Sequence, residues 1–465
     1  MPKICDFGKV VALYIAKRFL MMKYNCYIIA ALMALSAAAS EKKWTADDCM
    51  RYAIENNFDV KSAEITHDND RLDYKKAVGS FFPTVGASLS LQGSFGRSID
   101  PATNTYDNLR TLSNGYGLSL SWDIFTGGQI INQFKRAKAQ KQMSESALQS
   151  RRDEIAINVL DAFVNLQYYT ELMKITGLKL EESRAVLAQT QRMKELGLKS
   201  AVDVSQAEAQ VADDDYTHTN TQSMFTNSLI TLKNTMNFPV ADTLELAGPE
   251  NSIYSGGGTR STIEIMEFAR SNNPIMRQAE LSKNIAKYSL RSAKGAWTPS
   301  ISISAGLSDS YYKRYGTENQ PYKEQMNANF GQYVGVSMSI PIFDGLSRSN
   351  SVKKAKNQAV EAQIDYDRKL YELQTSVEQA VTDCNNAEKE ALKMEKKEIS
   401  DSVAYRFAKR KYDEGLMSFL DMRETMNTWF ESQAELVRCR LLFDVKRRLV
   451  DYYRTNRIYQ ETINE

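Results

Sequence analysis

Four segments of the chain alternate between apolar side chains and small polar ones, mostly Ser and Gly. Their apolar positions are Val85, Ala87, Leu89 and Leu91; Tyr116, Leu118, Leu120, Trp122 and Ile124; Ile301, Ile303, Ala305 and Leu307; and Val334, Val336, Met338, Ile340 and Ile342. A period of two is typical of β-strands with one apolar and one polar face. The pattern predicts two pairs of strands, each about ten residues long, the length of strands in membrane barrels.

Most of the remaining chain has the period of an α-helix. No proline occurs from Gly128 to about Glu195, or from Gly345 to Glu414. Within these segments apolar residues recur at alternating spacings of three and four, as in coiled coils. These positions are Ile155, Val159, Ala162, Leu166, Tyr169 and Met173, and then Leu370, Leu373, Val377, Ala380, Cys384, Ala387, Ala391 and Met394. At 1.5 Å rise per residue, each segment predicts a helix roughly 100 Å long.

A turn is expected after each long helix, because Gly197 and Gly415 can adopt the positive φ angle that ends a helix. Shorter helices are expected at about 45–79, 200–237, 262–295 and 418–455. The Tyr- and Asn-rich stretches 96–114 and 308–332 are expected to form external loops within the two strand pairs.

The second half of the chain repeats the first. Residues 124–140 resemble 342–358, and residues 196–204 resemble 414–422 at the same offset. The expected organisation is a signal peptide at 1–39, a first repeat at 40–247, a Gly-rich connector at 248–261, a second repeat at 262–456 and a C-terminal tail at 457–465. Each repeat would contain a helix, a strand pair and a long helical hairpin.

The N-terminus has the three parts of a secretory signal. Lys23 is the charged start, residues 27–35 form a short apolar stretch, and Ala37–Ala39 offer small residues for cleavage. Met21 or Met22 is a possible true start, and a retained anchor helix is the alternative interpretation. No lipidation motif lies at the cleavage point, so the expected mature protein is exported and not acylated. Three cysteines would remain, Cys49, Cys384 and Cys439; an odd number at wide spacing predicts buried thiols rather than a disulfide framework.

The composition narrows the possible functions. The chain has 59 basic and 57 acidic residues, a formal net charge of +2, whereas nucleic-acid-binding proteins have a strongly basic face. Only two histidines occur, His67 and His218, too few for a histidine-rich metal centre. The run Gly256–Gly258 lacks the Lys-Ser/Thr and the preceding strand of a phosphate-binding loop, which favours a flexible connector. No enzyme activity, cofactor or metal is expected, and no nucleic-acid partner.

Four strands cannot close a membrane barrel, because bacterial outer-membrane barrels have at least eight strands and open edges are not tolerated in lipid. Three chains would supply twelve, so membrane strands would require a homotrimer. Aromatic residues near the strand ends suit interfacial girdles: Phe81, Phe82, Trp122, Phe125, Trp297, Tyr311, Tyr312, Tyr333 and Phe343. The alternative interpretation of the strands is the edge of a soluble sandwich.

The order of elements and two motifs resemble the TolC-type outer-membrane efflux protein family, from about Trp44 to Tyr453. The junction Pro341–Gly345 resembles the family's Pro-[Ile/Leu]-Phe-x-Gly-Gly, with Leu346 in place of the second glycine. In the first copy the motif keeps Gly127–Gly128 but has Asp instead of Pro. A second motif, Gly-Leu-x-Ser-x-x-Asp, occurs at residues 197–203 and again at 415–421, after equally long prolineless segments.

The resemblance implies a mainly helical chain with a membrane β-part, in which a trimeric twelve-stranded β-barrel continues as an α-helical barrel. It implies a passive exit duct in the outer membrane that extends into the periplasm. The expected partners are two further copies of the chain, a periplasmic adaptor protein, an inner-membrane pump and outer-membrane lipid. The expected cargo is small molecules or drugs. Alternatives are a duct for type I protein secretion or metal-ion efflux, and a periplasmic coiled-coil structural protein without a pore.

The resemblance also implies two sets of site residues. The expected adaptor-docking tips are Gly197, Leu198, Ser200, Asp203, Gly415, Leu416, Ser418 and Phe419, among which Leu198, Leu416 and Phe419 are expected to be exposed apolar contacts. The expected periplasmic gate is Tyr412, Asp421 and Glu424. The alternative interpretation is that the Gly and Ser residues only form turns, and that the two carboxylates only begin a solvated helix.

Overall fold

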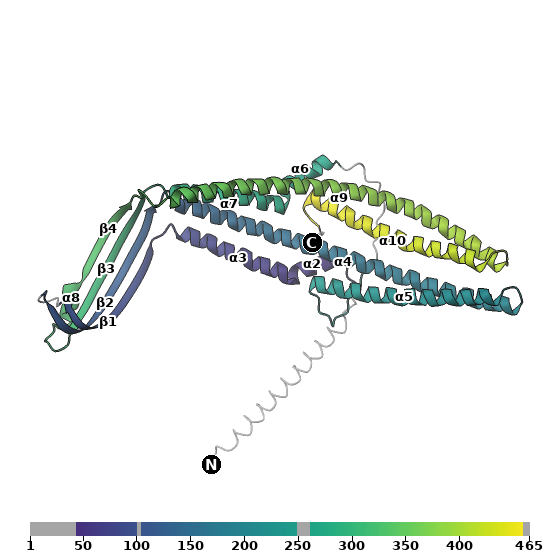
Figure 1. The fold of residues 1–465 in the computed structure, drawn as a ribbon, viewed down its shortest axis with the longest axis horizontal. Coiled ribbons are helices and arrows are strands. Elements are labelled where there is room, and N and C mark those ends of the chain that lie inside the picture. Colours follow the sequence, from purple (N-terminus) through teal and green to yellow (C-terminus); the bar gives the residue numbers. More distant parts are fainter. Residues whose placement is uncertain (1–42, 100–103, 249–260, 459–465) are drawn as a thin grey trace, which may run out of the picture.

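The computed structural model of the chain describes residues 43–99, 104–248 and 261–458. The expected signal peptide lies outside the described residues, as do most of the Gly-rich connector and most of the C-terminal tail. The molecule is elongated, with one β-sheet at one end and two helical hairpin tips at the other (Figure 1).

The elements follow the expected order. The first half contains α2 (Ala46–Asn56), α3 (Phe58–Gly79), β1 (Thr84–Ile99), β2 (Tyr106–Phe125), α4 (Gln129–Glu195) and α5 (Ala201–Met236). The second half contains α6 (Thr262–Asn272), α7 (Pro274–Gly295), β3 (Ser300–Arg314), α8 (Tyr322–Asn329), β4 (Gly331–Ser339), α9 (Ser347–Asp413) and α10 (Phe419–Thr455). The long helices α4 and α9 have 67 residues each.

Each helix expected before a strand pair is in fact two helices. The first breaks at Asn57, whose side chain accepts a hydrogen bond from the backbone N–H of Asp59 at 2.8 Å and so caps α3. The second breaks at Asn273, which caps α7 in the same way and precedes Pro274. In such a cap, the side-chain oxygen of Asn accepts the hydrogen bond of a backbone N–H at the start of the next helix. This N–H then needs no carbonyl partner in the preceding turn, so the cap favours a break between two helices over one continuous helix.

The four strands form one antiparallel sheet in the order β1-β2-β3-β4. The register is continuous along β1 and β2, from the Thr84–Ser121 pair to the Ile99–Tyr106 pair. The edges of the sheet are therefore β1 and β4, and both are open in the single chain.

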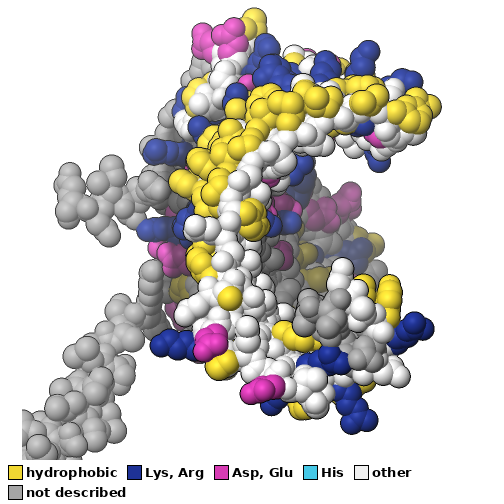
Figure 2. Space-filling view, turned by 90° about the vertical axis from the view of Figure 1, so that its left-hand side faces the viewer, with side chains coloured by type: hydrophobic (Ala, Val, Ile, Leu, Met, Phe, Trp, Pro, Cys, Tyr) yellow, Lys and Arg dark blue, Asp and Glu magenta, His cyan; other side chains and the backbone are white. Residues whose placement is uncertain are grey.

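The register separates the side chains of the sheet into two faces. One face is formed by Val85, Ala87, Leu89, Leu91, Leu118, Leu120, Trp122, Ile301, Ile303, Ala305, Leu307, Val334, Val336 and Met338. The opposite face is formed by Gly86, Ser88, Ser90, Gly115, Gly117, Ser119, Ser121, Ser302, Ser304, Gly306, Ser308, Gly335 and Ser337. Figure 2 shows the hydrophobic side chains gathered along one side of the curved sheet, with white atoms on the other. The expected alternation of faces is confirmed.

The strands differ from the expectation in length. β1, β2 and β3 have 16, 20 and 15 residues, and β4 has nine and ends before Ile340. The expectation of loops over 96–114 and 308–332 was therefore wrong for most of both stretches. Polar composition does not stop strand pairing, because a part of the sheet beyond an apolar band can meet water on both faces.

Two aromatic residues expected in the girdles lie on the polar face instead. Tyr312 lies opposite Ser113, and Tyr333 lies opposite Gly306. The Tyr333 ring covers Gly306 closely, since a Cβ atom built on that glycine would come within 2.6 Å of it. Glycine is needed there because any side chain would displace the ring.

The helix α8 completes the edge of β3 where β4 is too short to do so. The side-chain amide of Gln325 bonds both the N–H and the C=O of Tyr312, at 3.0 Å each. Asn319 bonds both backbone groups of Arg314 in the same manner, at 2.7 and 2.8 Å. These side chains replace the missing strand partner and satisfy its hydrogen bonds.

A close backbone contact fixes the junction between sheet and helices in the first half. Gly127 has φ +65°, and a Cβ atom there would come within 2.2 Å of the carbonyl oxygen of Gly295 and within 1.9 Å of Thr298 Oγ1. The equivalent Gly345 has φ +64° but nothing within 4 Å of such an atom. Leu346, which follows it, is held at φ +68° although it is not glycine.

Three apolar clusters hold the helices together along the length of the molecule. One joins α2, α4 and α5, a second joins α6, α9 and α10, and a third lies close to the hairpin tips between α4, α9 and α10. Cys49, Cys384 and Cys439 are buried free thiols, as expected.

Candidate functional site

The first hairpin tip is a tight turn that is fixed by hydrogen bonds. Gly197 has φ +75°, and the N–H of Leu198 donates to the carbonyl of Met193 at 2.8 Å, which closes the end of α4. Ser200 caps α5: its hydroxyl accepts from the Asp203 N–H at 3.2 Å, and the Asp203 carboxylate accepts from the Ser200 N–H at 2.8 Å. These hydrogen bonds from Ser200 hold the pKa of Asp203 below its usual value.

The second tip repeats this geometry. Gly415 has φ +74°, and the N–H of Leu416 donates to the carbonyl of Lys411 at 2.8 Å. Ser418 caps α10 by accepting from the Asp421 N–H at 3.2 Å, and its hydroxyl donates to the Asp421 carboxylate at 2.7 Å. The Gly, Ser and Asp residues of both motifs therefore have clear structural roles as turn and cap residues.

The tips expose apolar side chains. The exposed fractions of Leu198 and Leu416 are 69% and 74%. Three further apolar residues within or next to the motifs are exposed and were not predicted, namely Leu196, Val202 and Leu420. Their position within a few residues of each glycine was the available signal. The expectation that Phe419 is exposed was wrong: only 2% of it is accessible, because its ring packs against Tyr412 with the centroids 6.2 Å apart.

Tyr412 joins the two hairpins. It is fully buried, and its hydroxyl lies 2.6 Å from the hydroxyl of Thr190 on α4. Lys199, from the first tip, places its ammonium 4.4 Å from the centre of the Tyr412 ring and donates to the carbonyl of Met417 at 3.2 Å. Burial raises the pKa of Tyr412 above its usual value, which favours the protonated hydroxyl.

A second set of polar contacts joins the hairpins further from the tips. Glu182 on α4 accepts hydrogen bonds from Tyr405 at 2.6 Å and from Lys409. Burial alone would raise the pKa of Glu182, but these two donors outweigh it and leave the pKa below its usual value. Gln189 also donates to Asp413 at 3.0 Å. Tyr412 was predicted from the sequence, but its hydrogen-bond partner Thr190 was not, since Thr190 lies 222 residues away along the chain.

The two carboxylates expected at the gate lie on the returning helix α10. Asp421 and Glu424 are both exposed and three residues apart, so they project from the same face of the helix. Among the described residues, no Lys or Arg lies within ion-pair distance of either one. Within the described ranges, therefore, no ion pair neutralises their negative charges.

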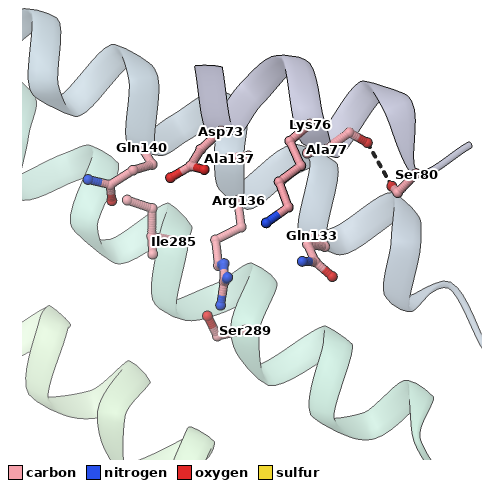
Figure 3. Close-up of a pocket in the computed structure, with 10 residues that line it drawn as sticks. All are labelled: Asp73, Lys76, Ala77, Ser80, Gln133, Arg136, Ala137, Gln140, Ile285 and Ser289. Atoms are coloured by element: carbon pink, nitrogen blue, oxygen red, sulfur yellow. Dashed lines mark hydrogen bonds between the residues drawn. The ribbon is translucent and has the colours of Figure 1, made fainter. Parts of the chain in front are cut away.

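The helical wall near the sheet contains a polar groove of about 560 Å³ between α3, α4 and α7. Figure 3 shows Lys76, Arg136 and Gln133 pointing into it, with Ser289 on the opposite side. The groove is lined by exposed and half-buried side chains, with the buried Ala77 among them, and its residues come from three packed helices of the wall.

Within the described residues, no helix has the length and apolarity that a membrane span requires. The same part of the chain contains no group of His, Cys, Asp and Glu side chains that is arranged to hold a metal ion.

The fold is similar to that of solved outer-membrane channels. It is similar to the Campylobacter jejuni CmeC outer membrane channel, with a TM-score of 0.77 and 18% sequence identity over 90% of this chain and 87% of that one. Residues 50–237 and 265–446 match the family model of outer membrane efflux proteins. The chain belongs to this family and is an outer-membrane protein.

Two relatives show how far the similarity in sequence extends. A probable efflux pump outer membrane protein, TtgC of Pseudomonas putida, is 24% identical and covers 87% of this chain and 83% of its own length. The outer membrane protein TolC of Escherichia coli is 22% identical and covers 63% of this chain and 59% of its own length.

Proposed function

We propose that three copies of this chain close a twelve-stranded barrel in the outer membrane, which continues as a tube of α-helices into the periplasm. The observation behind this proposal is the four-stranded sheet with two open edges. Unpaired backbone groups at such edges are too costly in lipid, and pairing β4 of one copy with β1 of the next would close both edges along the nine residues of β4.

The two faces of the sheet support the same arrangement. The apolar face suits contact with lipid chains, and the Ser/Gly face suits a water-filled interior. Small side chains on the inner face also leave the passage wide. A soluble sandwich would instead have to bury its apolar face against a second sheet, and the described residues contain only one sheet.

The channel serves as a passive exit duct in a tripartite exporter. An inner-membrane pump would supply the energy, and a periplasmic adaptor would connect the pump to the hairpin tips. Relatives are named as antibiotic and toluene efflux proteins, which favours small-molecule or drug cargo. A wide polar passage contributes little selectivity itself, so the pump would determine which molecules leave.

The hairpin tips form the docking site for the adaptor. Leu198 and Leu416 are the central contacts, and Leu196, Val202 and Leu420 extend the same apolar surface. Exposed apolar side chains at the end of a helical tube would cause aggregation unless a partner covers them. Phe419 contributes indirectly, because it supports Tyr412 from within the core.

The gate lies at the same end of the tube. In a trimer, Asp421 and Glu424 would bring six carboxylates to the entrance, and such a ring attracts cations and repels anions. Their mutual repulsion opposes closure. The buried contact between Tyr412 and Thr190 would oppose that repulsion by holding the two hairpins together.

Cellular export of a fluorescent dye tests the proposed function. The double variant Leu198→Asp/Leu416→Asp should reduce export at least tenfold and weaken cross-linking to the adaptor, because each change places a charge in an apolar contact. The control variant Leu198→Met/Leu416→Met keeps the apolar contact and should export normally. Normal export by the Asp variant would refute docking at the tips, and export of a co-expressed secreted protein instead of dye would assign the duct to protein secretion.

A further inference from the structure

Three basic residues form a diagonal row across β1, β2 and β3. Arg110 lies directly opposite Phe95, two residues from Arg97 on β1. On β3, Lys313 lies directly opposite Leu112, which is two residues after Arg110 on β2. Lys313 is therefore the diagonal neighbour of Arg110 on that side. Directly paired residues share a face, and side chains at diagonal positions of an antiparallel sheet lie about 7–8 Å apart. The three cations are therefore consecutive neighbours on one face of the sheet.

This face is the apolar one. Arg97 follows Val85, Ala87, Leu89 and Leu91 at the same alternation, so it continues their side of β1. The three cationic side chains are exposed. Arg110 and Lys313 lie on the inner strands β2 and β3, and Arg97 lies on the edge strand β1. Strand pairing with another copy uses backbone groups in the plane of the sheet, so it leaves side chains on this face accessible.

The row lies just beyond the apolar band. Lys313 is twelve residues after Ile301 on β3, which corresponds to about 40 Å along the strand and about 30 Å along the membrane normal at the usual tilt. The apolar band of such barrels is about 25 Å tall. The three cations therefore lie at the height of the lipid headgroups of the outer leaflet.

The part of the chain that the structure describes shows no ion pair to these charges. Among the described residues, Arg97, Arg110 and Lys313 have no carboxylate within ion-pair distance. At a separation of about 7–8 Å between diagonal neighbours, the three positive charges repel one another. An anion outside the chain would turn the repulsion into attraction.

Aromatic rings surround the row. Arg97 lies 5.6 Å from the ring centre of Tyr106, and Lys313 lies 5.4 Å from that of Tyr315. Below them, Tyr322 of α8 packs against Tyr311 with the centroids 5.0 Å apart and bonds the hydroxyl of Tyr116 at 3.1 Å. Tyrosines that present both a ring and a hydroxyl suit a sugar, which has apolar faces and a polar rim.

We propose that Arg97, Arg110 and Lys313, with the tyrosines around them, form a binding site for the phosphorylated sugar headgroup of an outer-leaflet glycolipid. The row spans roughly 15 Å from end to end, which suits a headgroup with two phosphates better than the single phosphate of a phospholipid. The helix α8 supports the site by holding Tyr322 against the sheet. This inference rests on the proposed placement of the strands in the bilayer.

Titration of the purified full-length protein with lipid A, a diphosphorylated disaccharide lipid, tests the site. Native mass spectrometry would count the lipids bound, with phosphatidylglycerol as a second probe. The variant Arg97→Gln/Arg110→Gln/Lys313→Gln should bind lipid A about 100-fold more weakly, since each basic residue at a membrane surface contributes about a fivefold gain in affinity. The control Lys389→Gln/Lys393→Gln/Lys396→Gln removes the same charge from exposed positions of α9 and should bind normally.

Unchanged lipid A binding by the triple variant would overturn the proposal. Equal affinity of the unmodified protein for phosphatidylglycerol and lipid A would overturn the assignment to a glycolipid. A separate measurement tests the proposed channel function on its own: the conductance of both triple variants in phosphatidylcholine bilayers. Both variants should conduct normally, because the channel does not depend on whether the glycolipid site is intact.

Discussion

The hydrogen bond between Thr190 and Tyr412 should respond unequally to two conservative variants, one at each residue. The Thr190 hydroxyl lies 2.7 Å from the carbonyl oxygen of Val186 and donates its single proton there. The Tyr412 hydroxyl, at 2.6 Å, must then donate to Thr190. Tyr412→Phe removes a donor and leaves the Thr190 proton bonded, whereas Thr190→Val leaves the Tyr412 proton buried without an acceptor.

The two variants should therefore destabilise the contact by different amounts of free energy. Removing a hydrogen bond whose remaining partner stays satisfied costs about 1 kcal/mol, and leaving a buried donor unsatisfied costs about 2 kcal/mol. If the contact exists only in the closed gate, Tyr412→Phe should raise the ratio of open to closed channels about fivefold, and Thr190→Val about thirtyfold. The double variant replaces both partners with apolar groups and should lie closer to the unmodified protein than Thr190→Val does.

Single-channel recording in planar bilayers measures this ratio directly as the fraction of time that each channel spends open. Trimer yield should be unchanged for all three variants, since the contact lies near the tips and far from the sheet. The reasoning is refuted if Tyr412→Phe opens the channel more than Thr190→Val, or if neither variant changes the open fraction.

Three further predictions concern other parts of the molecule. Gly127→Ala should lower the free energy of unfolding by at least about 3 kcal/mol, and Gly345→Ala by about 1–2 kcal/mol, as measured by thermal unfolding. The reason is that a Cβ atom at Gly127 would lie 2.2 Å from the carbonyl oxygen of Gly295, whereas one at Gly345 would meet nothing within 4 Å. Equal losses for the two variants would contradict this. Asp421→Ser/Glu424→Ser should lower the cation preference of the channel in bilayers, and unchanged selectivity would remove both residues from the gate. The pKa of Glu182 is lowered in the folded protein, so the ionised carboxylate stabilises the contact between the hairpins. This stabilisation should be fully present above the ordinary glutamate pKa of about 4.3, and it should be lost as the pH falls through the lowered pKa of Glu182. Glu182→Gln should remove this acid-dependent opening in recordings at decreasing pH.

The sequence predicted those features that depend on local periodicity. Alternation from Val85 to Leu91 defines a strand with two faces because side chains of a strand point to opposite sides. The long segments without proline predict α4 and α9 to within a few residues, because a helix continues until a residue such as Gly197 ends it. The tip turns were predictable for the same reason.

Contacts between distant segments could not be predicted in this way. The partner of Tyr412 is Thr190, which no local pattern connects to it. The burial of Phe419 follows from the third apolar cluster, whereas its position beside the turn suggested exposure. The extent of β3 depends on amide side chains of Asn319 and Gln325, which bond its edge although their sequence is typical of a loop.

Electron cryo-microscopy of the full-length protein in lipid nanodiscs tests the central claim most directly. The account predicts three copies around one axis, with β4 of each hydrogen-bonded to β1 of the next and the Ser/Gly face lining one continuous passage. A particle with another number of copies, or one whose apolar face points inward, would contradict it.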